Sequence, residues 1–166
     1  KPPVAKFGYK ITDCDNKRFI TFLDSSLTNA IYGPITYQWD FGDGSPTSGL
    51  QAPTHTYAAL GTYNVTLSVT NGPCSYQITK PVILINESAA FTASKNPVCK
   101  GEAFTLSATG SNPTNIKDYT WVIGPYIIPD TVRSSDFTLV NYGSYDVKLI
   151  IEDINGCKDS VTISNF

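Results

Sequence analysis

Residues 39–44 read WDFGDG and hold the residue types in this chain best suited to chemistry. Two carboxylates, Asp40 and Asp43, stand beside two glycines directly after a strand-like run that ends in tryptophan. This pattern is compatible with a hydrogen-bonded turn, a metal-binding loop or a catalytic acid pair. Aspartates satisfy backbone amides and glycines accept a positive φ, so we predict that Asp40, Gly42, Asp43 and Gly44 form a structural turn.

Calcium is the alternative at these aspartates, because hard cations take clustered carboxylate and carbonyl oxygens. Asp40 and Asp43 are one pair of candidate ligands, and Asp13 and Asp15 in the sequence DCDN are a second pair. Residues 39–44 lack the alternating D-x-D-x-D-G register and a distal glutamate. We therefore expect no cofactor, with calcium at these four aspartates as the alternative.

A catalytic interpretation is poorly supported by the rest of the chain. His55 is the only histidine, and Ser25 and Ser26 are not in a nucleophile elbow. No glycine-rich phosphate loop lies between a strand and a helix. We predict that the chain is not an enzyme and that His55 is a partly buried hydrogen-bonding residue beside the core.

Composition narrows the classes of partner. The chain has 166 residues with 12 basic and 14 acidic side chains, and a net charge of -2 predicts no nucleic-acid binding. The longest aliphatic run, residues 82–85, is too short to span a bilayer, so we expect no membrane span in this segment. Hydrophobic residues make up 41%, which is enough to build a core.

Alternating patterns predict an all-β fold. Residues 61–70 read GTYNVTLSVT and place apolar side chains at every second position, as a strand with one buried face requires. Residues 36–41 alternate in the same way, so we expect Trp39 to lie in the core, and Trp121 likewise. Glycines and prolines at short intervals indicate turns between strands.

The alternating segments occur twice. Trp39 and Trp121 are 82 residues apart, and so are Tyr63 and Tyr145 within LGTYNVTLSVT and YGSYDVKLIIE. Each copy has the length of a small β-sandwich. We predict two immunoglobulin-like β-sandwich domains in tandem, residues 1–86 and 87–166.

The cysteines follow the same repeat. Cys14 and Cys74 flank the first copy, and Cys99 and Cys157 flank the second. In each copy one cysteine precedes an early strand and the other follows the tyrosine-containing strand. We predict one disulfide within each copy and hence an oxidising compartment. Zinc is the alternative, but the chain has no C-x-x-C and a single histidine.

The first copy resembles the polycystic-kidney-disease (PKD) domain family. The resemblance rests on WDFGDG followed by HTY at residues 55–57, a G-x-Y and an alternating V-x-L-x-V strand. It implies an immunoglobulin-like sandwich found in tandem in extracellular proteins, usually as a spacer or interaction module. The second copy resembles a diverged PKD domain, in which Pro125 and Tyr126 replace Asp43 and Gly44.

The departure in the second copy also marks a candidate contact surface. Residues 124–130 read GPYIIPD and place Tyr126, Ile127 and Ile128 between two prolines, which confine the segment to an edge or a loop. An exposed apolar edge of this kind usually has a use, so these three residues are candidates for contact with a partner. We favour the interpretation that their side chains pack on the second copy's own sheet or on the first copy, with the partner site as the alternative.

These features together favour a non-catalytic, extracellular spacer or interaction module of a cell-surface or secreted adhesin-like protein, with a resemblance to bacterial surface proteins. The alternative is an accessory module, binding carbohydrate or protein, of a secreted hydrolase or protease. A third hypothesis is a receptor-like binder that uses the loops at one end. The expected partners are a protein or carbohydrate ligand and adjacent domains of the same chain.

Overall fold

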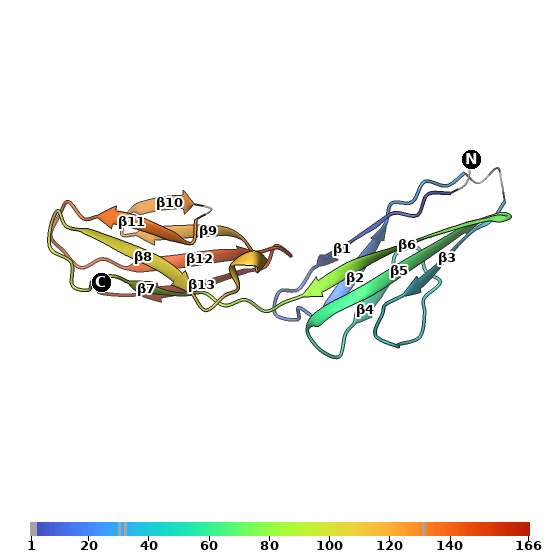
Figure 1. The fold of residues 1–166 in the computed structure, drawn as a ribbon, viewed down its shortest axis with the longest axis horizontal. Coiled ribbons are helices and arrows are strands. Elements are labelled where there is room, and N and C mark those ends of the chain that lie inside the picture. Colours follow the sequence, from blue (N-terminus) through green and yellow to red (C-terminus); the bar gives the residue numbers. More distant parts are fainter. Residues whose placement is uncertain (1–2, 30, 32, 131) are drawn as a thin grey trace. The chain divides into compact units, whose positions relative to one another are not determined.

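The computed structural model describes residues 3–29, 31, 33–130 and 132–166, with the backbone alone at 128–130. It divides into two compact units, Lys1–Asn86 and Glu87–Phe166. Each unit has two antiparallel sheets with a hydrophobic core between them (Figure 1). The expected all-β fold with two immunoglobulin-like sandwiches is confirmed.

The first unit pairs two three-stranded sheets, with strand orders β1-β2-β4 and β3-β5-β6. The long hairpin of the second sheet runs β5 and β6 together over their full lengths, around the turn that contains Gly72. Its strands are β1 (Phe7–Ile11), β2 (Phe19–Asp24), β3 (Ile35–Asp40), β4 (Thr54–Thr56), β5 (Gly61–Asn71) and β6 (Cys74–Leu84).

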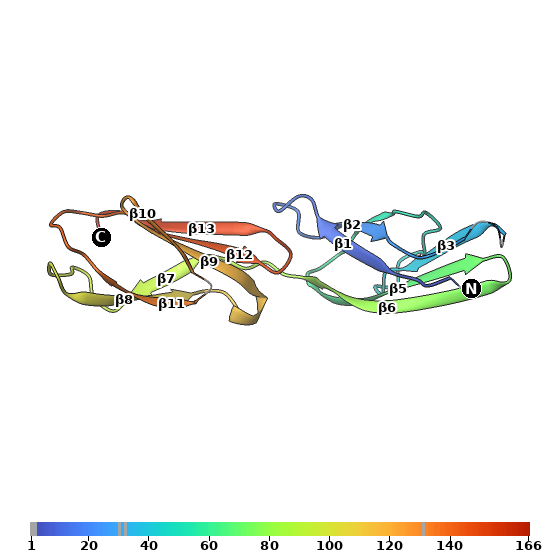
Figure 2. The same ribbon diagram turned by 90° about the horizontal axis from the view of Figure 1, so that it is seen from above.

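The second unit has a three-stranded sheet, β11-β8-β7, and a four-stranded sheet, β10-β9-β12-β13 (Figure 2). A short 3-10 segment, η2 (Pro113–Asn115), leads into β9. Its strands are β7 (Ala90–Ala93), β8 (Ala103–Thr109), β9 (Ile116–Ile123), β10 (Tyr126–Asp130), β11 (Ser134–Thr138), β12 (Val147–Asp153) and β13 (Lys158–Ile163).

The alternation seen in the sequence matches the burial of the strands. Val65, Leu67 and Val69 on β5 are all 0% exposed, and their neighbours on the other face are not buried. Trp39 and Trp121 are both fully buried, each in the core cluster of its own unit. Each cluster draws side chains from both sheets of its unit, so each unit buries its own core.

The repeat extends to strand register. Trp39 on β3 pairs with Leu67 on β5, and Trp121 on β9 pairs with Leu149 on β12. The units differ at the strand exit that follows each tryptophan strand. In the first unit a loop follows β3 and touches it through one isolated bridge, Trp39 to Ser48. In the second unit that place is taken by a full edge strand, β10, paired with β9.

None of the described residues forms a helix of the length and hydropathy needed to cross a membrane.

Candidate functional site

The WDFGDG stretch forms a turn closed by its own side chains. Asp40 ends β3, and its Oδ1 accepts a hydrogen bond from the backbone N–H of Gly42 at 2.9 Å. Gly42 and Gly44 have φ values of +76° and +80°. This left-handed region costs glycine little and other residues more, so the two glycines permit the chain to reverse here.

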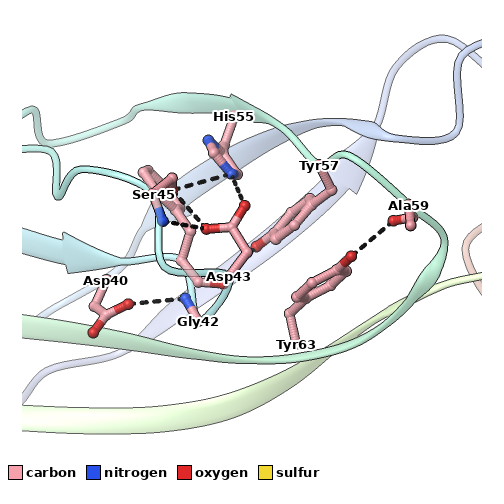
Figure 3. A network of polar contacts seen from close by, with 9 residues as sticks. Asp40, Gly42, Asp43, Ser45, His55, Tyr57, Ala59 and Tyr63 are labelled. Carbon is pink, nitrogen blue, oxygen red and sulfur yellow. Dashed lines mark hydrogen bonds and ion pairs between the residues drawn. The ribbon is translucent and has the colours of Figure 1, made fainter.

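Asp43 is the centre of a polar cluster that the turn makes with β4 (Figure 3). Its Oδ1 accepts hydrogen bonds from the hydroxyl of Ser45 at 2.5 Å and from the backbone N–H of Ser45 at 3.1 Å. Its Oδ2 lies 2.7 Å from Nε2 of His55 on β4. The cluster therefore ties the turn to the facing sheet.

The His55 ring is held on both sides. It stacks on Phe41 with ring centroids 4.1 Å apart and an interplanar angle of 2°. Tyr57 meets it edge-on at 4.6 Å. The side chains of His55 and Asp43 are only 15% and 16% exposed, so the pair is largely shielded from water. His55 is thus a partly buried residue with a hydrogen-bonding partner.

These contacts shift the acidity of their neighbours. Burial by itself would raise the pKa of Asp43, but the hydrogen bonds from Ser45 and His55 outweigh it and lower that pKa from 3.8 to about 2. Burial, with the nearby charge of Asp43, raises the pKa of the Tyr57 phenol. The carboxylate of Asp43 is therefore held in its charged form.

Two tyrosines complete the site. The Tyr57 hydroxyl donates to the carbonyl of Phe41 at 3.1 Å, and the Tyr63 hydroxyl donates to the carbonyl of Ala59 at 2.9 Å. Their rings stack with centroids 4.1 Å apart. The HTY motif is visible in the sequence, whereas the contacts of Ser45 were not predicted. Its position two residues after an aspartate is the signal of an Asx turn.

Three of the four candidate calcium ligands accept hydrogen bonds within their own turns. Asp13 Oδ1 accepts backbone N–H groups of Asp15 and Asn16, while Asp40 and Asp43 accept the bonds described above. Among the described residues no three His, Cys, Asp or Glu side chains are grouped as a metal site would require. Calcium binding remains an untested prediction.

The predicted disulfide within each copy is wrong. Cys14 and Cys157 are disulfide-bonded, whereas Cys74 and Cys99 are free and exposed. The two cysteines of each copy lie at opposite ends of their own sandwich. The equal spacing of the cysteines in the two copies does not reveal this separation.

In the first unit, the length of the strands explains why Cys14 and Cys74 cannot form a disulfide with each other. Cys14 lies beside Leu60 and Asn86, at the start of β5 and the end of β6, whereas Cys74 begins β6 opposite Asn71. A strand of 11 residues spans about 33 Å at about 3.3 Å per residue, far beyond the reach of a disulfide.

The second unit repeats this separation. Cys99 lies in the connection from β7 to β8, where its carbonyl accepts the N–H of Glu102. Cys157 lies in the turn after β12, which is bonded to Asn115 of η2 through the N–H of Ile154. These positions are at opposite ends of β8, about 20 Å apart for its 7 residues.

The candidate contact segment forms β10, an edge strand. Tyr126 and Ile127 are 54% and 68% exposed. Ile128 pairs with Trp121 through the backbone, and its side chain lies outside the described residues. Tyr126 also borders a pocket of about 280 Å³ in the second unit. The sequence patterns did not predict this pocket.

Comparison with known proteins identifies the family. A sequence model of the PKD domain matches residues 1–80. The crystallised PKD1 domain of the Vibrio cholerae metalloprotease PrtV is 32% identical; the match covers 52% of this chain and 100% of that domain, with a TM-score of 0.44. The chain belongs to the PKD domain family.

A longer match extends over both PKD-like units. The pre-pro-metalloprotease PrtV of Vibrio cholerae serotype O1 is 31% identical over 165 residues, which cover 97% of this chain. The chain spans 17% of the length of PrtV. A microbial collagenase of Vibrio alginolyticus is 46% identical over 52 residues, 31% of this chain and 6% of that protein. Segments of bacterial proteases are therefore among the relatives of this chain.

Likeness of fold extends further than likeness of sequence. The fibronectin(III)-like modules of Clostridium thermocellum CbhA align with a TM-score of 0.53 at 16% identity, covering 89% of this chain and 84% of theirs. At that identity the match shows the fold alone. It agrees with two immunoglobulin-like sandwiches.

Proposed function

We propose that this chain is a non-catalytic, extracellular accessory segment of a secreted bacterial protease. The observation that carries the proposal is the match to PrtV, because it runs through 165 residues and hence through both units rather than through one domain. The adhesin-like spacer favoured by the sequence becomes the alternative, since the matches to PrtV and the Vibrio collagenase are both to proteases.

The geometry of the polar cluster supports a structural role. Serine catalysis needs a histidine that removes the proton of the serine hydroxyl, with a carboxylate on the far side of the histidine. In this chain the Ser45 hydroxyl is 2.5 Å from Asp43 and 3.5 Å from His55, so its short bond goes to the carboxylate. The carboxylate thus lies between the serine and the histidine, which is not the order that serine catalysis needs.

An extracellular location is supported by the cysteines. Cys14 and Cys157 are disulfide-bonded, and such bonds persist in oxidising compartments. A disulfide-bonded segment suits a protein that works outside the cell, where reductants are scarce and proteases are present.

Excision tests the accessory role. In the full-length protein that carries this chain, removing residues 1–166 should reduce cleavage of large proteins such as casein and gelatin, while cleavage of a short peptide substrate stays unchanged. The physical reason is that an accessory segment binds or positions a large substrate without touching the reacting bond. The control replaces Asp40 with Asn, which keeps the segment in place.

The opposite outcomes are distinct. Equal loss on both substrates would mean that the segment supports folding of the protease rather than substrate capture. Saturable binding of the isolated chain to a glycan or an extracellular-matrix protein, without any effect of excision on proteolysis, would support the adhesin-like alternative. Hydrolysis of casein by the isolated chain that is lost on Asp43→Asn would overturn the non-catalytic proposal.

A further inference from the structure

An apolar pocket of about 280 Å³ opens in the second unit, where β9 turns into β10 and β11 runs into the following loop. Its size approaches that of small-ligand sites in proteins. None of its described lining residues is charged, and its rim includes Tyr126 and Val140, which are 54% and 61% exposed. The lining residues are Ile123, Tyr126, Phe137, Thr138, Leu139, Val140, Asn141 and Tyr145.

The internal repeat shows which part of the first unit corresponds to this pocket. The Tyr145 hydroxyl donates to the carbonyl of Asn141, as the Tyr63 hydroxyl does to that of Ala59, and both pairs are offset by 82 residues. The glycine before each tyrosine has a matching φ, +154° in one copy and +151° in the other. The two loops therefore have the same local structure.

Strand pairing extends the correspondence to the residues before the loop. His55 pairs with Ile20 on β2, and Phe137 pairs with Phe104 on β8. Phe137 thus stands where the first unit has His55. Two positions later along the chain, Leu139 of the second unit corresponds to Tyr57 of the first unit.

In the first unit the corresponding space is filled by the Tyr57 ring. Tyr57 is 0% exposed, stacks on Tyr63 at 4.1 Å and donates its hydroxyl to the carbonyl of Phe41. The equivalents of these three residues are Leu139, Tyr145 and Ile123, and all three line the pocket. A leucine has no ring to stack on Tyr145. The pocket is therefore the space that an aromatic ring occupies in the other copy.

A second trace of the same replacement lies nearby. In the first unit the loop after β3 supplies the carbonyl of Leu50, which accepts the indole N–H of Trp39 at 2.9 Å. In the second unit the shorter β9–β10 connection replaces that loop, and the buried indole N–H of Trp121 has no hydrogen-bond partner among the described residues. The second unit thus lacks both the ring and the acceptor that the first unit has.

We propose that this pocket binds an aromatic side chain presented by an uncharged peptide segment of a partner protein, whose ring stacks on Tyr145 as Tyr57 stacks on Tyr63. The absence of charge in the lining matches an uncharged occupant. A peptide fits better than a sugar, because the polar side chains of the lining are only Thr138, Asn141 and the tyrosine hydroxyls, and that of Tyr145 is already bonded.

Small amides test the ring preference directly. The complete chain is isotopically labelled, and backbone amide shifts are followed by NMR during titration with N-acetyl-tyrosinamide, N-acetyl-leucinamide and methyl glucopyranoside. The proposal expects saturable shifts at Val140, Asn141 and Tyr145 with the tyrosine amide, and binding of the leucine amide at least about tenfold weaker. Equal shifts with both amides would overturn the ring preference, and shifts with the glucoside alone would make the pocket a carbohydrate site.

A substitution that fills the pocket with a side chain of the chain itself gives the main test variant. Leu139→Tyr restores the ring that the first unit has, so it should raise the melting temperature and abolish the shifts caused by the tyrosine amide. Leu27→Tyr is the matched control, since Leu27 lies in the first unit and is 68% exposed. It should leave both properties unchanged.

A second variant keeps the test decisive if Leu139→Tyr fails to fold. Val140→Asp changes an exposed rim residue, so it should fold normally and weaken binding of the tyrosine amide at least about tenfold, because a carboxylate at the rim must be desolvated. Unchanged binding in Val140→Asp, or no shifts with any probe in the unaltered chain, would show that the pocket is a packing defect and not a binding site.

Discussion

At the scale of single residues, Asp43 makes the connection on which the first unit's turn depends. It accepts two hydrogen bonds from Ser45 and one contact from His55, and so joins the turn after β3 to strand β4 of the other sheet. Charge-assisted hydrogen bonds are stronger than neutral ones, and these are shielded by the aromatic rings around His55. The cluster should therefore stabilise the fold in a pH-dependent way.

Replacing Asp43 with Asn should lower the free energy of unfolding at neutral pH by about 2 kcal/mol, because the charged acceptor is lost. Ser45→Ala removes one donor and should have a smaller effect. Urea unfolding followed by circular dichroism measures both. An Asp43→Asn variant as stable as the unaltered chain would contradict the assigned role of the cluster.

The lowered pKa of Asp43 predicts that the fold loses stability in acid. The folded-state pKa of Asp43, about 2, lies below the ordinary 3.8, so its contribution is present above about pH 4 and is lost as the pH falls towards 2. The difference in stability between the unaltered chain and Asp43→Asn should shrink over that range. Urea unfolding at a series of pH values from 2 to 6 checks this; a constant difference would contradict it.

Calcium should leave the melting temperature unchanged. The candidate ligands Asp13, Asp40 and Asp43 already accept hydrogen bonds from their own turns, so a cation would have to displace these bonds. Thermal unfolding in EDTA and in millimolar calcium measures the effect. A rise that Asp43→Asn or Asp13→Asn removes would assign a calcium site to that residue.

At the scale of elements, the two units differ in how the chain leaves the strand that carries the tryptophan. After β3 the chain makes the WDFGDG turn and a loop whose Leu50 carbonyl accepts the indole N–H of Trp39. After β9 it makes a tight turn at Gly124 into the edge strand β10. The added strand extends the sheet, but its described residues supply no acceptor for the indole of Trp121. The pocket itself lies in the second unit because Leu139, which follows β11, stands where the first unit has the ring of Tyr57.

The glycines of the WDFGDG turn should differ sharply in their tolerance of a side chain. A Cβ at Gly42 would lie 2.4 Å from the backbone oxygen of Asn64 on β5, while a Cβ at Gly44 would meet no atom within 4 Å. Both have positive φ, so Gly44→Ala should cost only about 1 kcal/mol. Gly42→Ala should cost clearly more, because strand and turn must separate.

Thermal and urea unfolding of the two alanine variants make this comparison, with each serving as the control for the other. Equal losses of stability in the two variants would show that the positive φ alone determines the destabilisation. The contact between a Cβ at position 42 and β5 would then be relieved by a small shift of the backbone.

At the scale of the whole molecule, the chain consists of two sandwiches, each with its own hydrophobic core and its own copy of the tryptophan and tyrosine framework. The cysteines do not follow this symmetry. Cys74 and Cys99 are free and exposed, and Cys14 and Cys157 are disulfide-bonded. Measuring which cysteines have free thiols therefore tests this assignment of free and bonded cysteines directly.

A maleimide reagent should label Cys74 and Cys99 in the native chain without reductant, and Cys14 and Cys157 only after reduction. Peptide mapping by mass spectrometry identifies the labelled positions. The variants Cys74→Ser and Cys99→Ser should each remove one native label and leave the melting temperature nearly unchanged. A native chain without reactive thiols would instead favour a disulfide within each copy.

The sequence by itself determined the strands, the repeat and the family. Alternation over residues 61–70 predicts one buried face because neighbouring side chains of a strand point to opposite sides. The WDFGDG and HTY motifs predict the PKD family, and the glycines and aspartates predict a turn, because these are properties of adjacent residues. The structure and the comparisons confirm the all-β fold and the family.

Only the tertiary structure decided which distant groups meet. Equal spacing of the cysteines in the two copies suggested one bond in each, but the lengths of β6 and β8 hold those pairs apart. The contact between Asp43 and His55 depends on two sheets facing each other across the core. The pocket beside Tyr145 depends on the volume that Leu139 leaves unfilled. Distances and volumes of this kind follow from long-range packing, which no local pattern encodes.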